Sequence, residues 1–418
     1  MTAVESALLA LTAAAIHGEA PQDPALSAAE WADLFRLSER HKLLPLIADA
    51  AAPLPSLHAA VGQAGGPDWN QVTTTVYSEV NRQMYQENEF LNLLLDLRAA
   101  GLEPLVLKGP ILRALYPKPL LRPSVDDDLF IPPERAEDYH RALLARDLNA
   151  DHPAADPQTA DELSYHRPES PLYIELHKAL FDTGSAVFAG YNDGFTASPD
   201  VPETVRIQDV TIRTLPPTEH LRFLLLHACK HFFHSGFGLR IVSDICLFAR
   251  AYAERIDFSA VRAACAGLHC ERFADAIFRI GEKHLGIPAP ICFAGDVEEA
   301  ALLADVLDAG LHGATLDRLH SSSVTLETIA SARTGTAVRS GLRQAMFPPL
   351  SRLKGRYPFL EKHPWLLPWA WARRAAGFAV GRLRGKESAP ADSLRIGKER
   401  VALLREYELI DGRNEISP

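Results

Sequence analysis

The feature that most constrains the fold of this chain is a pair of short apolar runs, between residues 105 and 131, with the composition of β-strands. The second run begins with three consecutive carboxylates, Asp126, Asp127 and Asp128. Because alternate side chains of a strand project from the same face, we expect Asp126 and Asp128 to converge while Asp127 points away. Oxygen ligands of this kind suit Mg²⁺. A turn or a solvated strand end is the alternative interpretation.

The first run ends at Lys108 and Gly109, where a helical pattern begins. A strand-to-helix turn directs free backbone N–H groups toward an anion. Lys108 would then supply a positive charge to a phosphate, or it would simply end the strand.

A third carboxylate is expected on a neighbouring strand. Polar and apolar residues alternate from Leu172 to His177, which places Tyr173, Glu175 and His177 on one face. A carboxylate beside the aspartate pair is what a two-metal site for phosphoryl transfer requires.

Together these motifs resemble those of the bacterial uncharacterised nucleotidyltransferases, a family within the polymerase-β-like nucleotidyltransferase superfamily. The resemblance covers the chain from about Ser27 to Tyr357. The runs that carry it are L-K-G-P-I-L-R-A-L-Y (107–116), R-P-S-V-D-D-D-L-F-I (122–131), I-E-L-H (174–177), L-L-L-H-A-C-K-H (224–231) and L-R-I-V-S-D-I (239–245).

The resemblance implies a metal-dependent transferase. Asp126, Asp128 and Glu175 are expected as the catalytic residues that hold Mg²⁺ or Mn²⁺, and His177 as the partner that orients Glu175. The enzyme would move a nucleotidyl group from a nucleoside triphosphate (NTP), ATP among them, to an unidentified acceptor, with pyrophosphate leaving.

Nucleotide binding is expected from Lys108, the N–H of Gly109 and Arg122, which would position the phosphates. The chain departs here from the wider superfamily, whose helix-opening turn is usually Gly-Gly or Gly-Ser.

An α+β fold follows, in which a small mixed-sheet nucleotidyltransferase core has a helical N-terminal region and a helical C-terminal half. The chain of 418 residues exceeds what one core usually organises. The expected regions are a helical region (1–100), the core (101–215), a helical domain (216–340), and a basic Trp-rich segment with a C-terminal helix (341–418).

Three local signals refine this division. Ser27 and Glu30 have the spacing of a capping box. A helical pattern runs from Pro133 to Arg146. Thr218 is expected to cap the helix that follows two prolines.

A second polar cluster, spaced by three and four residues along one expected helix, consists of His227, Lys230, His231 and His234. Zinc is disfavoured, because no acidic residue accompanies the histidines and the lysine adds a repelling charge. We expect buried core histidines, or residues that face the nucleotide across the cleft. Arg240 and Asp244 on the next helix are expected to pair with each other.

Positive charge is concentrated between residues 352 and 386, where nine basic residues accompany three tryptophans and the acidic Glu361, in a chain of net charge −10. We expect an amphipathic helix folded back over the acidic body. Binding to an anionic surface or partner is the alternative, and would make the protein a membrane- or polyanion-associated scaffold. A catalytically silent nucleotide- or partner-binding protein of the same fold is a further alternative.

The sequence predicts a cytoplasmic protein. Its five cysteines are odd in number and lack a C-x-x-C pair, which is typical of a reducing compartment. The apolar run from Ala7 to Ile16 lacks the basic residues of a signal peptide. No transmembrane segment is expected, because Pro368, Arg373 and Arg374 interrupt the stretch from Trp365 to Val380.

Overall fold

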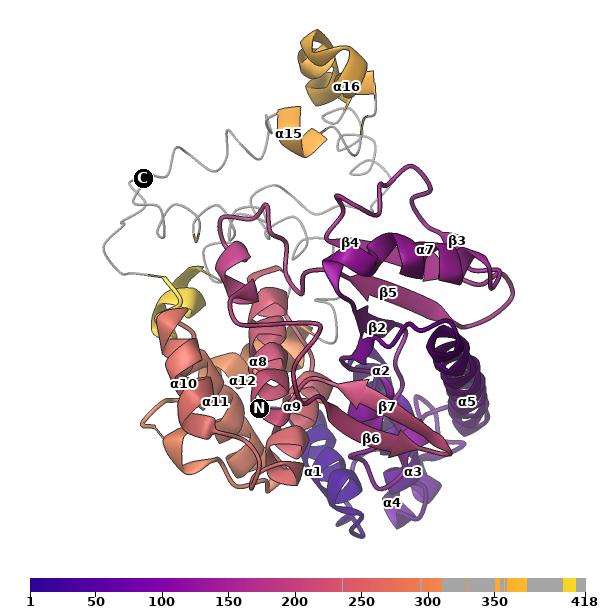
Figure 1. Cartoon of the computed structure of the whole chain (residues 1–418). Coiled ribbons are helices and arrows are strands. Elements are labelled where there is room, and N and C mark those ends of the chain that lie inside the picture. The colour runs from indigo at the N-terminus through magenta and orange to yellow at the C-terminus, as the bar shows by residue number, and fades with distance from the viewer. Residues whose placement is uncertain are drawn as a thin grey trace.

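The computed structural model describes residues 1–234, 236–293, 295–309, 329, 350–353, 357, 359–373 and 401–410. Helices surround a five-stranded mixed sheet, with a separate two-stranded hairpin beside it (Figure 1). The predicted α+β fold is confirmed.

The N-terminal region is helical, as predicted. Thr2 and Ser27 each form a capping box with a glutamate three residues later, so the capping box expected at Ser27 is confirmed. The longest helix ends just before Gly101, whose φ of 73° suits a helix C-terminus. The helices are α1 (Ala3–His17), α2 (Ala28–Arg40), α3 (Leu44–Ala51), α4 (Pro55–Ala60) and α5 (Trp69–Ala99).

The sheet has the order β1-β2-β5-β4-β3, in which β2 and β5 are parallel and the other pairs are antiparallel. The three strands predicted from the sequence are confirmed as β1, β2 and β5. In the parallel pair Asp128 lies opposite Glu175, and Phe130 lies opposite His177. The strands are β1 (Leu105–Val106), β2 (Asp127–Phe130), β3 (Asn149–Ala150), β4 (Glu162–His166) and β5 (Tyr173–His177).

One face of this sheet is apolar and covered. Leu129, Ile174 and Leu176 share a buried core with the C-terminal half of α5, with α7 (Ala136–Leu144) and with the hairpin of β6 (Glu203–Ile207) and β7 (Val210–Thr214). The helix predicted from Pro133 to Arg146 is shorter than expected, since a 3₁₀ turn (η2, Pro133–Arg135) precedes α7. The polar residues of the strands therefore lie on the opposite face.

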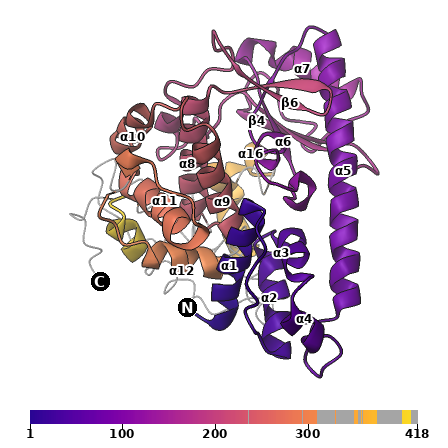
Figure 2. The same ribbon diagram turned by 90° about the horizontal axis from the view of Figure 1, so that it is seen from below.

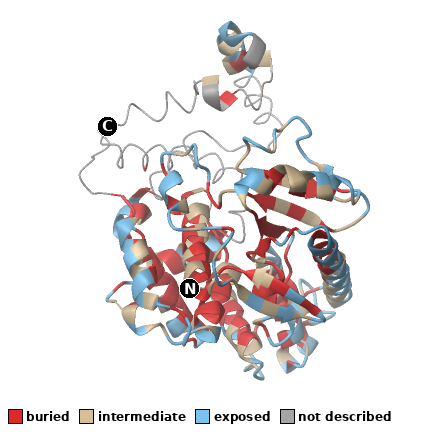
Figure 3. Cartoon of the chain, viewed as in Figure 1, coloured by how far each residue is buried: buried red, intermediate tan, exposed pale blue. Residues whose placement is uncertain are grey.

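The helical half packs on the N-terminal helices. Side chains of α1–α4 and α8–α12 form one large buried core, and α1 lies beside α9 and α11 in Figure 2. Figure 3 shows the buried residues concentrated in these helices and in the strands, whereas the outer side of α5 is exposed. The helices are α8 (Pro217–His234), α9 (Leu239–Ala251), α10 (Phe258–Gly267), α11 (Glu271–Leu285) and α12 (Ala300–Ala309).

The start of α8 differs from the prediction. The helix begins at Pro217, so Thr218 lies inside it and is not its cap. A proline suits the first helical position because its missing N–H is not needed there. The hydroxyl of Thr218 instead accepts a hydrogen bond from the N–H of Asp257, at 3.0 Å.

Long-range polar contacts fasten α8 and α9 to the sheet. The Nε2 atom of His220 on α8 donates to the carbonyl oxygen of Leu107 at the end of β1. On α9, Asp244 accepts from Nε and Nη2 of Arg122, at 3.1 and 2.5 Å. The pairing expected between Arg240 and Asp244 is therefore wrong, since Arg240 donates to the carbonyl oxygen of Pro123. These contacts hold the helical half over the polar face of the sheet.

The short elements between the larger ones are α6 (Pro110–Arg113), η1 (Pro119–Leu121), η3 (Ala189–Asn192), η4 (Ile291–Phe293), α15 (Leu350–Leu353), α16 (Phe359–Lys362) and η5 (Pro364–Leu366). Among the residues described, no helix has the length and apolar character needed to cross a membrane.

The basic Trp-rich segment is only partly within the described residues. Trp365 and Trp369 are 73% and 50% exposed, which does not agree with packing of these rings on the body. Residues 354–356, 358 and 374–386 of the segment lie outside the described residues. The predicted C-terminal helix is present at 401–406, and Leu404 and Tyr407 are buried in the large core.

Two buried histidines give a pH dependence to stability. His41 accepts from the N–H of Leu239 through Nδ1 and donates from Nε2 to the carbonyl oxygen of Leu307, at 3.1 and 3.2 Å. Burial lowers the pKa of His41 and of His220 to about 4. Because the unfolded chain binds these protons near pH 6.5, the free energy of unfolding should fall between about pH 6.5 and 4, by about 3 kcal/mol per ring.

Urea unfolding of the parent and of His41→Gln across this pH range measures the effect. The variant is expected to be less stable at pH 7, because its hydrogen bonds are altered, yet to lose less stability on acidification. The exposed His58→Gln serves as the control. An equal loss on acidification in parent and His41→Gln would contradict the prediction.

Candidate active site

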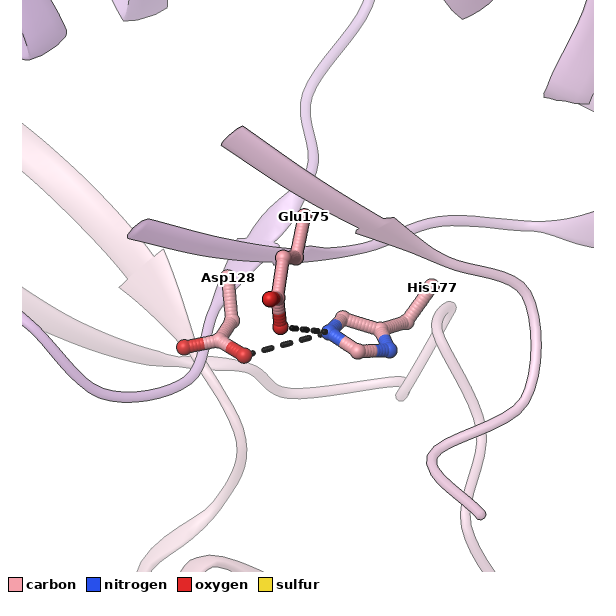
Figure 4. Close-up of side chains that lie close together, drawn as sticks. All are labelled: Asp128, Glu175 and His177. Carbon is pink, nitrogen blue, oxygen red and sulfur yellow. Dashed lines mark hydrogen bonds and ion pairs between the residues drawn. The ribbon is translucent and has the colours of Figure 1, made fainter. Parts of the chain in front are cut away.

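Three side chains meet on the polar face of β2 and β5. One ligand atom each from Asp128, Glu175 and His177 lies within 4.8 Å of the others. Figure 4 shows Asp128 on one strand and Glu175 on its neighbour, with both carboxylates directed at the same nitrogen of His177. The Nε2 atom is 3.1 Å from Asp128 Oδ1 and 3.6 Å from Glu175 Oε2. The parallel pairing of Asp128 with Glu175 produces this convergence.

The charges of these groups are strongly coupled. Burial acts to lower the pKa of His177, but its hydrogen bonds to Asp128 and Glu175 raise it to about 9. The ring is therefore an imidazolium at neutral pH, and donates from Nε2 to Asp128. Burial acts to raise the pKa of Asp128, but Lys108 and His177 hold it below its usual range. Burial raises the pKa of Glu175.

Lys108 lies between the two aspartates at the end of β1. Its Nζ is 3.0 Å from Asp128 Oδ1, 3.9 Å from Asp126 Oδ2 and 3.3 Å from His227 Nε2. Burial opposes its charge, but the carboxylates of Asp128, Asp126 and Glu175 outweigh burial and raise the pKa of Lys108. In this structure the positive charge of Lys108 thus compensates the negative charges of these carboxylates.

Gly109 makes the turn that follows. Its φ of 47° and ψ of −115° lie in a region that residues with a side chain rarely adopt. A Cβ atom at this position would be 2.5 Å from Asp127 Oδ1. Both the conformation and the close approach of the backbone to Asp127 therefore require glycine.

Asp127 points to the opposite face, as predicted. Its Oδ2 accepts a hydrogen bond of 2.9 Å from Nε2 of Gln86 on α5. Burial raises the pKa of Asp127 to about 7, against the opposing charge of Arg113. A second glutamine of the same helix, Gln83, accepts from the N–H of Ser124 at 2.6 Å. These two hydrogen bonds from α5 thus hold in place the segment that carries the aspartates.

Arg122 is placed away from these carboxylates. Two of its three nitrogens donate to Asp244, and this ion pair is buried. Its Nη1 is buried and makes no hydrogen bond within the described part of the chain. The structure thus gives Arg122 a role in attaching α9, and its contact with a nucleotide stays a prediction.

Helix α8 contributes His227, for which the sequence left two interpretations open, a buried core histidine or a residue that faces the nucleotide. His227 contacts Lys108, and its Nε2 lies 3.3 Å from Nε2 of His231. Burial, followed by the charge of Lys108, lowers the pKa of His227 well below the usual value. The ring is therefore neutral and accepts a hydrogen bond from Lys108. The i, i+4 spacing of the two histidines was the available signal.

The cluster has the donors that a hard divalent cation requires. Asp128 Oδ2 is buried and has no hydrogen-bond partner among the described residues, so one carboxylate oxygen is free to bind a cation. The two carboxylates suit Mg²⁺ or Mn²⁺, and the protonated ring of His177 supports them as a hydrogen-bond donor rather than as a ligand. The predicted ligand Asp126 lies outside the 4.8 Å cluster; its side chain is 35% exposed, so the cluster opens to solvent on this side.

A model of the family described as uncharacterised nucleotidyltransferase matches residues 27–286, more than half of the chain. The chain belongs to this nucleotidyltransferase family. The matched region begins at the cap of α2, ends at the cap of α11, and includes every predicted site residue. Comparisons with curated proteins and with solved structures gave no match.

The extent of the family match is shorter than the resemblance predicted. It ends at residue 286, whereas the sequence motifs suggested about Tyr357. The nucleotidyltransferase region thus contains the sheet, the helices α2–α5 before it, and α8–α11 of the helical half.

Proposed function

We propose that this protein transfers a nucleotidyl group from an NTP to the hydroxyl of an unidentified acceptor, with Mg²⁺ or Mn²⁺ and with release of pyrophosphate. The observation that carries the proposal is the convergence of Asp128, Glu175 and His177 within 4.8 Å, with the second oxygen of Asp128 buried and unpaired among the described residues, in a chain of a nucleotidyltransferase family. Asp126, Asp128 and Glu175 would hold the metal. When bound, the metal lowers the pKa of the attacking hydroxyl and neutralises charge on the triphosphate.

Glu175 is suited to take the proton of the acceptor hydroxyl. Its pKa lies above that of an ordinary glutamate because of its burial, so the carboxylate is a stronger base. The imidazolium of His177, 3.6 Å away, orients it. Asp128 is kept ionised by Lys108 and His177, and is therefore ready to act as a ligand.

The phosphates would lie on the open side of this cluster, near Asp126 and Lys108. Lys108 would place its ammonium on a phosphate oxygen, with Gly109 allowing the backbone to approach. The neutral His227 on α8 would face the same space from the helical half.

Labelled NTPs test the proposal directly. The full-length protein is incubated with Mg²⁺ and each NTP, labelled in the α-phosphate, in a cell extract. Label is expected to move to an acceptor, which identifies both the acceptor and the preferred base. A protein that binds NTP but moves no label in any extract would be a silent member of the family, and the proposal would be wrong.

Binding can be measured without knowing the acceptor. Mg²⁺ and NTP together are expected to raise the thermal midpoint more than either does alone, because the metal is shared between carboxylates and phosphates. A ligand at 100 times its Kd stabilises the folded state by about 2.7 kcal/mol. Differential scanning fluorimetry gives the shift. If Asp128→Asn is stabilised as much as the parent, the nucleotide binds elsewhere.

A further inference from the structure

Two positive groups meet on one oxygen of the candidate metal site. Lys108 Nζ is 3.0 Å and His177 Nε2 is 3.1 Å from Asp128 Oδ1. The other oxygen of the same carboxylate is buried without a hydrogen-bond partner among the described residues. Asp128 therefore has one oxygen occupied by cationic groups and one left free.

The position of Lys108 is built by several elements. Asp128 on β2 and Asp126 just before that strand attract its ammonium, and His227 on α8 contacts it from the helical half. Only 18% of the lysine side chain is exposed. The ammonium thus lies between the two aspartates and is largely shielded from solvent.

A divalent cation on these carboxylates would meet this ammonium at short range. Metal–oxygen distances near 2 Å for Mg²⁺ would bring the ion close to Nζ, and like charges repel strongly where burial weakens the screening by water. The three carboxylates Asp126, Asp128 and Glu175 are already partly balanced by Lys108 and His177. A metal that enters while Lys108 remains would leave an excess of positive charge.

A bound triphosphate removes this conflict, because it supplies oxygens to which the flexible lysine side chain can move. We propose that Lys108 is the resident counter-ion of the carboxylates in the ligand-free protein and exchanges Asp128 for a phosphate when the NTP binds. The exchange makes metal binding depend on nucleotide, and a divalent ion alone binds weakly. This inference rests on the proposed function for its metal site.

Mn²⁺ binding in the absence of nucleotide tests the exchange. The concentration of free Mn²⁺ is followed by electron paramagnetic resonance during titration of the full-length parent, Lys108→Met, Lys108→Arg and Lys118→Met. Lys108→Met keeps the length of the side chain but removes its charge, and is expected to bind Mn²⁺ at least about tenfold more tightly than the parent. Lys108→Arg keeps the positive charge, so its affinity for Mn²⁺ should remain as weak as that of the parent. Lys118, which pairs with Asp49 on the surface, is the matched control and should not change the affinity.

Asp128→Asn separates the two hypotheses. If Asp128→Asn loses Mn²⁺ binding while Lys108→Met binds no more tightly than the parent, the counter-ion role is wrong and the metal site stands. If the double variant Lys108→Met/Asp128→Asn binds Mn²⁺ as tightly as Lys108→Met does, the metal site of the proposed function is wrong. Lys108→Gln, titrated in parallel, replaces Lys108→Met if circular dichroism shows that the methionine variant is unfolded.

Discussion

Asp128→Asn is expected to abolish nucleotidyl transfer, with a loss of at least about 10³-fold in rate. The substitution removes the charge of the carboxylate that lies at the centre of the site and has a free buried oxygen. It also leaves Lys108 and His177 without their shared counter-ion. The rate of label transfer from the preferred NTP measures the effect, with circular dichroism as the check that the variant is folded.

The matched control is Asp138→Asn, which neutralises an exposed carboxylate on α7 that pairs with Arg135 and Arg141. It should transfer label at nearly the parent rate. The rate of transfer by Asp126→Asn is expected to fall as well, because the proposed function makes this partly exposed aspartate a second metal ligand. Activity of Asp128→Asn within tenfold of the parent would exclude a metal-binding role for this residue.

Gly109→Ala is expected to lower the free energy of unfolding by about 3 kcal/mol, which is large for a single methyl group. The positive φ strains an alanine, and the new Cβ would overlap with Asp127 Oδ1. Asp127 cannot move away freely, because Gln86 and the body of α5 hold it. Urea unfolding at neutral pH measures the loss.

Gly101→Ala provides the comparison for this prediction. Gly101 also has a positive φ, of 73°, but a Cβ there would have nothing within 4 Å. We expect this variant to lose only about 1 kcal/mol, from the backbone conformation alone. Equal losses in the two variants would show that the approach of Gly109 to Asp127 carries no cost.

The local patterns of the sequence were sufficient to predict β1, β2 and β5 and the face on which Asp128, Glu175 and His177 lie, but not β3, β4, β6 and β7. Where polar and apolar residues alternate, every second side chain lies on the same face of the strand. Parallel pairing of β2 with β5 then places the polar side chains of the two strands side by side. Asp127 was correctly directed to the other face for the same reason, but the sequence did not indicate that Gln86 would bind it.

Contacts between distant segments could not be predicted in this way. Arg122 was expected to help position the phosphates, but the sequence did not indicate its carboxylate partner Asp244, which is 122 residues away on α9. The spacing of Arg240 and Asp244 suggested a local pair, but a buried arginine from the sheet region competes more effectively for Asp244. Lys108 was assigned to a phosphate from its turn, whereas its partners in the ligand-free protein come from β2 and α8. Such pairings leave no local signature in a single sequence.

The core shared by α1–α4 and α8–α12 has a consequence for synthesis of the chain. His17 at the end of α1 contacts the carbonyl oxygen of Leu285 at the end of α11, across 268 residues. At roughly 5–20 residues per second, the ribosome needs on the order of tens of seconds to deliver the second half of that core after the first has emerged. During this interval the apolar faces that α1–α4 bury against α8–α12 have no partner, so the N-terminal helices cannot complete their core before the second half of the chain emerges.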